Sequence, residues 1–136
     1  MVNQIGFYVP LKILYDQALT AVTDALKAEG FGVLTRIDVQ ATFKEKLGAD
    51  FRPYSILGAC NPSLSHRALS AEPEVGLMLP CNVTVESSGA DGSIVRIADP
   101  SAMLTIGPLG ANPILVDVAR QARARLERVA QSLSSL

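Results

Sequence analysis

The residues most able to do chemistry lie in one stretch of the chain, between Arg52 and Glu86. This stretch contains both cysteines, Cys60 and Cys81, and the only histidine, His66. A thiolate is a nucleophile and a ligand for soft metals, and imidazole is a base and a metal ligand. Ligand binding, thiol redox chemistry and soft-metal binding are therefore the functions to weigh.

The two cysteines are predicted to meet at one end of a sheet. Cys60 ends one predicted strand and Cys81 begins the next, so antiparallel pairing of these strands brings both thiols to the same edge. Asn61 and Pro62 mark the start of a helix there, since Asn caps helices and Pro fits the first helical position. The positive end of that helix favours a thiolate or a bound anion.

His66 lies about one turn into the same helix, and Pro80 and Asn82 flank the second cysteine. We therefore predict a ligand-binding corner with these candidate residues: Cys60, Asn61, His66, Pro80, Cys81 and Asn82. For Asn61 and Asn82, roles as cap and turn residues are an equal alternative. The bond before Pro80 is expected to be trans, as most X–Pro bonds are.

The sequence leaves the role of the two thiols open. Free cysteine is among the most often buried residue types, so both can be structural. The alternatives are a ligand pocket and a site for redox or soft-metal chemistry. A structural zinc site normally has four ligands, whereas this corner offers three at most and has no C-x-x-C. No catalytic residue is assigned, because no nucleophile elbow, H-E-x-x-H or acid–base pair is present.

The rest of the chain alternates between period-two and helical patterns. Strands are predicted at Asn3–Ile13, Phe31–Val39, Pro53–Cys60, Leu77–Glu86 and Ile94–Ala98, the last two joined by a hairpin. Helices are predicted from Tyr15 to the capping Gly30, at Ala41–Leu47, from Asn61 to before Pro73, and from Pro113 to about Ser132. A short helical turn follows Asp99, and Gly107–Pro113 is predicted to be a loop that covers the corner.

These elements predict a single α+β domain that spans residues 1–136. Its antiparallel sheet is covered on one face by two long helices, with short helical inserts between strands. Each long helix has an apolar stripe that would be buried against the sheet. The stripes consist of Tyr15, Ala18, Leu19, Val22, Ala25 and Leu26 in the first helix and Leu115, Val118, Ala122, Leu126, Val129 and Leu133 in the last.

The chain is close to neutral, with a formal net charge of −1, and contains 5% aromatic residues and no tryptophan. This composition argues against nucleic-acid binding, which depends on clustered Lys and Arg and on stacking side chains. No run of about 18 apolar residues is present, so no membrane span is expected. The first residues lack the features of a signal peptide, and two cysteines suit free thiols, so we expect a soluble cytoplasmic protein.

Several short segments resemble the signature of DUF302, a family of domains of unknown function found in bacteria and archaea. The segments are Gly30–Val33, Ile37–Val39, Lys46–Gly48, Tyr54, Ile56–Pro62, Ala68–Leu69, Glu72–Pro73, Gly76 and Leu79–Val83. The resemblance implies the β-α-β(4)-α fold shared with TATA-binding proteins, and it implies a homodimer. The family has no settled biochemical activity, so the resemblance implies no cofactor and no reaction.

We therefore predict a soluble homodimeric binding module without enzymatic activity, with an unidentified small ligand in a pocket at the Cys60/Cys81 corner. The alternative is a thiol-dependent redox, sulfur-handling or soft-metal-binding protein in which Cys60 is the more nucleophilic thiol. A structural or interaction scaffold without a small ligand is the third possibility.

Overall fold

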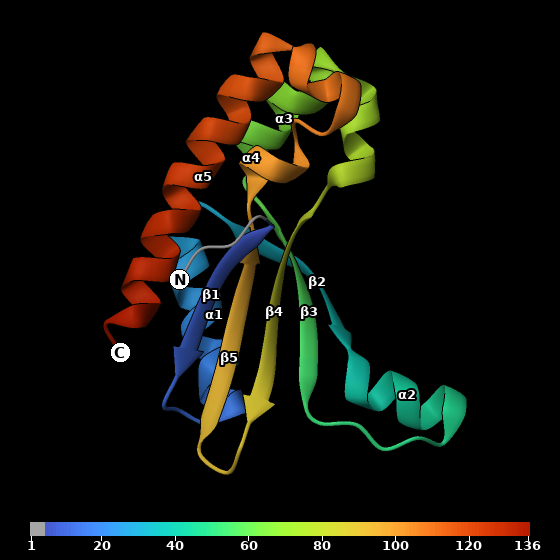
Figure 1. Ribbon diagram of the computed structural model, residues 1–136, viewed down its shortest axis with the longest axis vertical. Helices are drawn as coiled ribbons and strands as arrows, with labels where there is room; N and C mark the ends of the chain where they lie inside the picture. Colours follow the sequence, from blue (N-terminus) through green and yellow to red (C-terminus); the bar gives the residue numbers. More distant parts are fainter. Residues whose placement is uncertain (1–4) are drawn as a thin grey trace.

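The computed structural model describes residues 5–136, which form a five-stranded antiparallel sheet with helices against one face (Figure 1). The strands are β1 (Gly6–Leu11), β2 (Gly32–Asp38), β3 (Tyr54–Cys60), β4 (Cys81–Ser88) and β5 (Gly92–Ala98). The α-helices are α1 (Tyr15–Ala28), α2 (Val39–Leu47), α3 (Pro62–Ala71), α4 (Pro100–Met103) and α5 (Pro113–Ser134). Two 3-10 helices, η1 (Pro73–Met78) and η2 (Gly107–Ala111), lie in the connections. The predicted α+β class is confirmed.

The strand order β1-β5-β4-β3-β2 makes β3 and β4 neighbours, and every neighbouring pair is antiparallel. The segment between Cys60 and Cys81 must therefore leave the sheet and return to the same end of it. It does so as α3 followed by η1, and both lie beyond the end of the sheet (Figure 1). This connection is what creates space for a site at that end.

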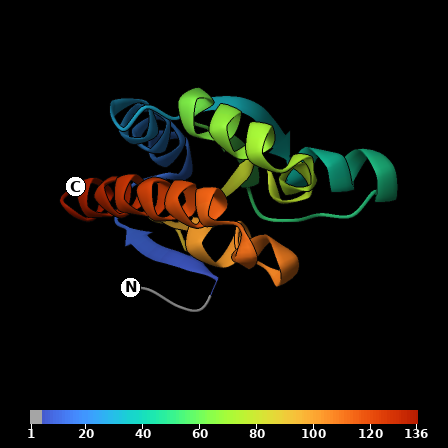
Figure 2. The same ribbon diagram turned by 90° about the horizontal axis from the view of Figure 1, so that it is seen from above.

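The helices α1 and α5 cover the same face of the sheet (Figures 1 and 2). Alternate strand residues point toward them, since side chains alternate between the two faces of a strand. The buried residues of the helices recur at helical spacing, and all but Ala119 of α5 belong to the predicted stripes: Ala18, Val22 and Leu26 in α1, and Leu115, Val118, Ala122, Leu126, Val129 and Leu133 in α5. The core is therefore the layer between the sheet and these two helices.

Helix starts follow the predicted cap-then-proline pattern. The side-chain oxygen of Asn61 accepts a hydrogen bond from the backbone N–H of Leu64 at 3.2 Å, and Pro62 is the first residue of α3. Asn112 accepts from the N–H of Ile114 in the same way at the start of α5. These caps satisfy N–H groups that have no partner within the helix. The predicted starts of both helices are confirmed.

Most predicted boundaries differ from the structure by one or two residues, and three segments differ by more. The strand predicted from Leu77 begins only at Cys81, because Pro73 fixes a helical φ and Glu72 caps η1 by accepting from the N–H of Glu74. The peptide bond between Leu79 and Pro80 is cis, so the expectation of a trans bond was wrong.

The segment Gly107–Pro113, predicted to be a loop, contains η2 and the start of α5. The strand predicted at Asn3–Ile13 is shorter in the structure, since β1 begins at Gly6 and ends at Leu11. Asn3 and Gln4 lie outside the described residues.

The edge strand β2 is paired with β3 and leads into α2, which extends away from the body of the molecule; residues 32–47 are called the β2–α2 arm (Figure 1). None of the α2 residues is buried. Large apolar side chains are exposed along the arm: Leu34 is 66% exposed, Ile37 51% and Leu47 73%. Isolated helices shorter than about 12–15 residues are marginal in water. Contact with a partner that buries these apolar side chains would therefore stabilise the β2–α2 arm.

A buried carboxylate organises the sheet face away from α1 and α5. Glu86 on β4 is 4% exposed, and it accepts hydrogen bonds from Arg52 and Arg96. The guanidinium group of Arg96 also lies 5.6 Å from the centre of the Tyr8 ring. Burial alone would raise the pKa of Glu86, but the hydrogen bonds and charges of Arg96 and Arg52 outweigh it and hold that pKa below its ordinary value.

Replacing Glu86 with Gln removes the charge that faces Arg52 and Arg96. We expect the free energy of unfolding at pH 7 to fall by about 1–3 kcal/mol, because the Gln amide has no charge and replaces one acceptor oxygen by an NH2 group that faces an arginine. The pKa of Glu86 is lowered by folding, so its contribution is complete above the unfolded-state pKa of about 4.3 and is lost as the pH falls through the folded-state pKa. Urea unfolding over a pH series measures both effects.

The exposed Glu74 provides the control, and Glu74→Gln should change stability by less than about 0.5 kcal/mol. A loss of stability in Glu86→Gln that stayed constant down to pH 3 would contradict the proposed role of the carboxylate charge.

Candidate functional site

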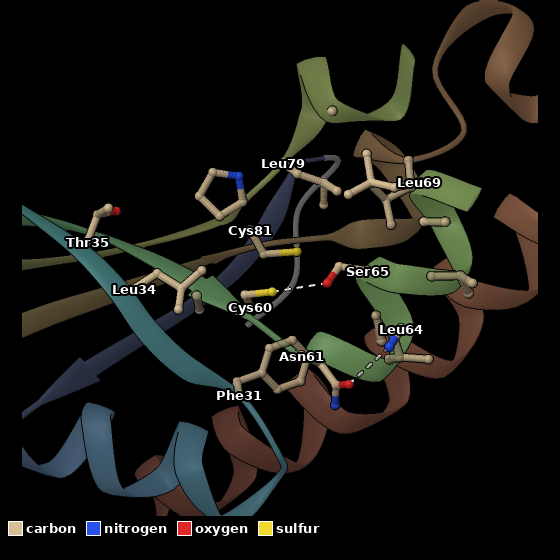
Figure 3. Close-up of a pocket in the computed structure, with 17 residues that line it drawn as sticks. Phe31, Leu34, Thr35, Cys60, Asn61, Leu64, Ser65, Leu69, Leu79 and Cys81 are labelled. Carbon is tan, nitrogen blue, oxygen red and sulfur yellow. Dashed lines mark hydrogen bonds between the residues drawn. The ribbon is translucent and has the colours of Figure 1, made fainter. Parts of the chain in front are cut away.

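A pocket of about 400 Å³ lies at the end of the sheet, beside the start of α3 (Figure 3). No acidic, basic or imidazole side chain is among the residues that line it. Its walls come from β2, β3, α3, η1 and the beginning of β4, with Leu104 and α5 at the back. The lining residues are Phe31, Leu34, Thr35, Ala59, Cys60, Asn61, Leu64, Ser65, Ala68, Leu69, Gly76, Leu79, Pro80, Cys81, Leu104, Val118 and Ala122.

The two thiols lie in the same wall of this pocket. Cys81 is directly opposite Ala59 in the β3–β4 ladder, and Cys60 is the next and last residue of β3. Both cysteines are half-buried and unbonded to each other. In Figure 3 both side chains are directed toward Ser65 on α3. The predicted meeting of Cys60 and Cys81 is therefore present in the structure.

A hydroxyl group orients the first thiol. The sulfur of Cys60 lies 3.1 Å from the Oγ of Ser65, and that hydroxyl also lies 3.3 Å from the backbone carbonyl of Pro62. When Ser65 donates to the carbonyl of Pro62, its oxygen is free to accept the S–H of Cys60. Ser65 was not predicted from the sequence, although its place one turn after the cap Asn61 is the signal that could have identified it.

Burial and, next, the negative charge of Cys60 raise the pKa of Cys81 to about 11. Cys81 is therefore a protonated thiol at neutral pH, since a thiol is deprotonated only near or above its pKa. Thiolates, not thiols, are the nucleophilic form. Cys81 is thus a weak nucleophile in the folded protein.

A glycine lets the outer wall close over the sheet. A Cβ atom added to Gly58 on β3 would lie 2.8 Å from the Cγ of Pro80 and would also collide with the hydroxyl of Thr35. Only the absence of a side chain at Gly58 allows both residues to approach the strand. Gly30 has a similar role beneath α3: its φ of +83° suits glycine, and an added Cβ would lie 3.0 Å from the Nδ2 of Asn61.

A family model described as "Domain of unknown function DUF302" matches residues 4–133. The chain belongs to the DUF302 family. The crystal structure of an uncharacterised conserved DUF302 protein from Bacillus stearothermophilus is similar, with a TM-score of 0.81 and 27% sequence identity over 94% of this chain and 97% of that one. None of the curated proteins compared with the chain matches it. Membership of the family agrees with the fold but assigns no function, so the function is inferred from the pocket.

Four of the six candidate residues of this DUF302 chain line the pocket, namely Cys60, Asn61, Pro80 and Cys81. His66 does not join them, because it lies on the exposed side of α3, between the inward-facing Leu64 and Ala68. A residue two positions from each of these points about 200° away around the helix.

Asn82 is also separate from the pocket. It is exposed on β4, and it lines a neighbouring hollow of about 270 Å³ that Pro80 and Cys81 also line. The segment Gly107–Pro113, predicted to cover the corner, contributes no residue to the pocket. The cover is provided instead by α3 and η1.

The described residues contain no group of three or more His, Cys, Asp or Glu side chains that could hold a metal ion. Within residues 5–136, no helix is both long enough and apolar enough to cross a membrane. The chemical groups of the pocket are therefore two thiols, two hydroxyls and an amide, set in an apolar lining.

The raised pKa of Cys81 predicts slow alkylation. In a Cys60→Ser variant, only Cys81 can react with iodoacetamide, and at pH 8 we expect it to react at least about tenfold more slowly than an exposed thiol. Its rate should keep rising well above pH 9, as the burial that raises its pKa persists in the variant. Mass spectrometry of timed samples measures the rate. Unfolding the same variant in urea should restore ordinary reactivity, whereas a midpoint near pH 8.5 in the folded protein would contradict the prediction.

Proposed function

We propose that this DUF302 protein is a non-enzymatic binding module for a small, uncharged, largely apolar molecule held in the Cys60/Cys81 pocket. The observation that carries the proposal is a pocket of about 400 Å³ without a charged lining side chain. Ligand pockets of proteins span about 300–1,000 Å³ and combine apolar walls with a few polar groups. The size and lining of this pocket match that description.

The residues that line the pocket indicate the charge and polarity of the ligand. A charged group placed among the buried lining residues Phe31, Leu64 and Val118 would lose its hydration without gaining an ionic partner, which is costly. A neutral apolar body gains from leaving water, at about 25 cal/mol for each Å² that is buried. The hydroxyls of Thr35 and Ser65 can hydrogen-bond one polar end of such a molecule. We therefore expect a neutral ligand with a hydroxyl or carbonyl group at one end.

Binding is favoured over catalysis by the absence of acid–base groups in the lining. The ionisable side chains that line the pocket are the two thiols, and the raised pKa keeps Cys81 protonated at neutral pH. General acid–base catalysis needs a group that gains and loses a proton near the working pH. The free thiols also fit a reducing compartment, which supports a cytoplasmic location.

Thiol redox chemistry is the second candidate function. It is favoured by two observations. Cys60 is next to Ala59, which is the partner of Cys81 in the neighbouring strand, and neither cysteine is in a disulfide. Cys60 would be the attacking thiol in such chemistry, because the raised pKa makes Cys81 the weaker nucleophile. If the pocket binds no ligand, the protein is instead a structural or interaction scaffold.

A Ser65→Phe variant tests the proposed pocket directly. The new ring projects from α3 into the cavity, so we expect binding of the neutral apolar probe N-phenyl-1-naphthylamine to weaken by at least about tenfold, which corresponds to 1.4 kcal/mol. Probe fluorescence measures the affinity. The matched control is Ser63→Phe, which places the same ring on the exposed side of the same helix and should bind the probe like the unmodified protein. Equal binding by both variants would refute the proposed site.

We also propose that two copies of the chain associate through the β2–α2 arm. An edge strand offers unpaired backbone groups, and antiparallel pairing of β2 with β2 of a second copy satisfies them around a two-fold axis. The opposite edge is less suited, because Pro10 in β1 has no N–H to donate. The arm carries Lys44 and Lys46 together with Glu45, so it is complementary in charge to a copy of itself.

Ile37→Glu tests this interface. A carboxylate at this exposed position would face its own copy near the two-fold axis, and like charges in close contact oppose association. We expect sedimentation velocity to show a dimer for the unmodified protein and a monomer for the variant. The control Ile114→Glu changes an isoleucine of similar exposure on α5 and should remain dimeric. A monomeric unmodified protein, or a dimeric Ile37→Glu variant, would disprove the proposal.

A further inference from the structure

We infer that Cys60 and Cys81 form a two-coordinate site for a soft monovalent metal ion of the Cu(I) type. The inference deepens the proposed function, since it names a second class of ligand for the same pocket and rests on that pocket being accessible. It does not depend on the identity of any organic ligand.

The donor set selects the class of ion. The pocket offers two sulfur atoms and no carboxylate or imidazole. Soft thiolate ligands prefer soft ions such as Cu(I), whereas Mg²⁺ and Ca²⁺ prefer oxygen. Zinc requires four ligands in a structural site, and the described residues contain no group of even three suitable side chains. The two sulfur atoms therefore match a d¹⁰ ion that can be coordinated by only two ligands, such as Cu(I).

The two cysteines come close together at the end of the β3–β4 ladder. Cys81 is opposite Ala59, and Cys60 is one residue further along β3. Opposed Cα atoms in an antiparallel pair lie about 4.5–5.5 Å apart and residues along a strand about 3.4 Å apart, which puts the two cysteine Cα atoms on the order of 6 Å apart. In Figure 3 both side chains turn toward the same helix. Both thiols also line the same pocket, and the proposed ion lies between them there.

The surroundings suit a metal thiolate. The hydroxyl of Ser65, 3.1 Å from the sulfur of Cys60, can rotate to donate to that sulfur once its proton has left. The complex carries one negative charge in an otherwise apolar lining, and the positive end of the ten-residue helix α3, which begins two residues after Cys60, offsets part of that cost. Phe31, which is 2% exposed, closes the inner side of the pocket.

The binding step balances without a redox change. Two S–H bonds break, two bonds from sulfur to the metal form, and both protons pass to water while copper remains Cu(I). Ser65 touches neither the metal nor the solvent proton acceptor in this scheme. It is a positioning residue for the sulfur of Cys60.

The test is titration of the reduced, oxygen-free protein with Cu(I) in competition with bicinchoninate. We expect one ion per chain and the loss of this stoichiometric binding in both Cys60→Ser and Cys81→Ser. Ser65→Ala should weaken binding by about tenfold, in the range found for residues that orient a metal ligand, and Ser63→Ala should not. X-ray absorption at the copper edge should show two sulfur neighbours and no nitrogen.

Far-UV circular dichroism reports whether each serine variant is folded, independently of the binding of N-phenyl-1-naphthylamine. Full Cu(I) binding by a folded Cys81→Ser variant, or a copper centre with nitrogen neighbours, would overturn the inference. Probe binding without Cu(I) binding in the unmodified protein would reject the metal site and leave the proposed function standing. Cu(I) binding without probe binding would support the metal site and reject the organic ligand.

Discussion

The antiparallel pairing of β3 with β4 is the constraint on which the site depends. The ladder places Leu57 opposite Val83 and Ala59 opposite Cys81. Leu57, Val83 and Val85 are buried beneath the helices, whereas Glu86 points to the other face. A slip of one residue would exchange the two faces of a strand and bring Glu86 into the apolar core. The burial of a few valine and leucine side chains therefore fixes the positions of the two thiols.

The connection between these strands becomes the outer wall of the pocket. Because it must return to the end of the sheet that it left, α3 and η1 fold over that end instead of over a face. The long helix α5 continues past the sheet and supports them, with Arg67 of α3 bonded to Asp117 of α5 at 3.0 Å. Val118 and Ala122 form the floor of the pocket from the same helix. The cavity lies between two anchored layers, so it does not need a mobile lid to exist.

Features set by neighbouring residues could be predicted from the sequence, and features set by distant contacts could not. The caps at Asn61 and Asn112 and the stripe around Leu126 depend on local spacing, so their prediction was confirmed. His66 was placed with the thiols because it is near them in the sequence, but the turn of the helix directs it outward. Ser65 is the residue that reaches Cys60, and its place one turn after the cap Asn61 was its only signal in the sequence.

The edge strand β2 links the pocket to the proposed interface. Leu34 and Thr35 line the pocket, while Ile37 and α2 belong to the exposed arm beyond them. A β-bulge between Val33 and Thr35 shifts the register there, so the strand changes its direction where the two surfaces meet. A second copy paired with β2 would hold this bulge in place and with it one wall of the pocket. Ligand binding and association would then be linked reciprocally, since each would favour the arrangement that the other requires.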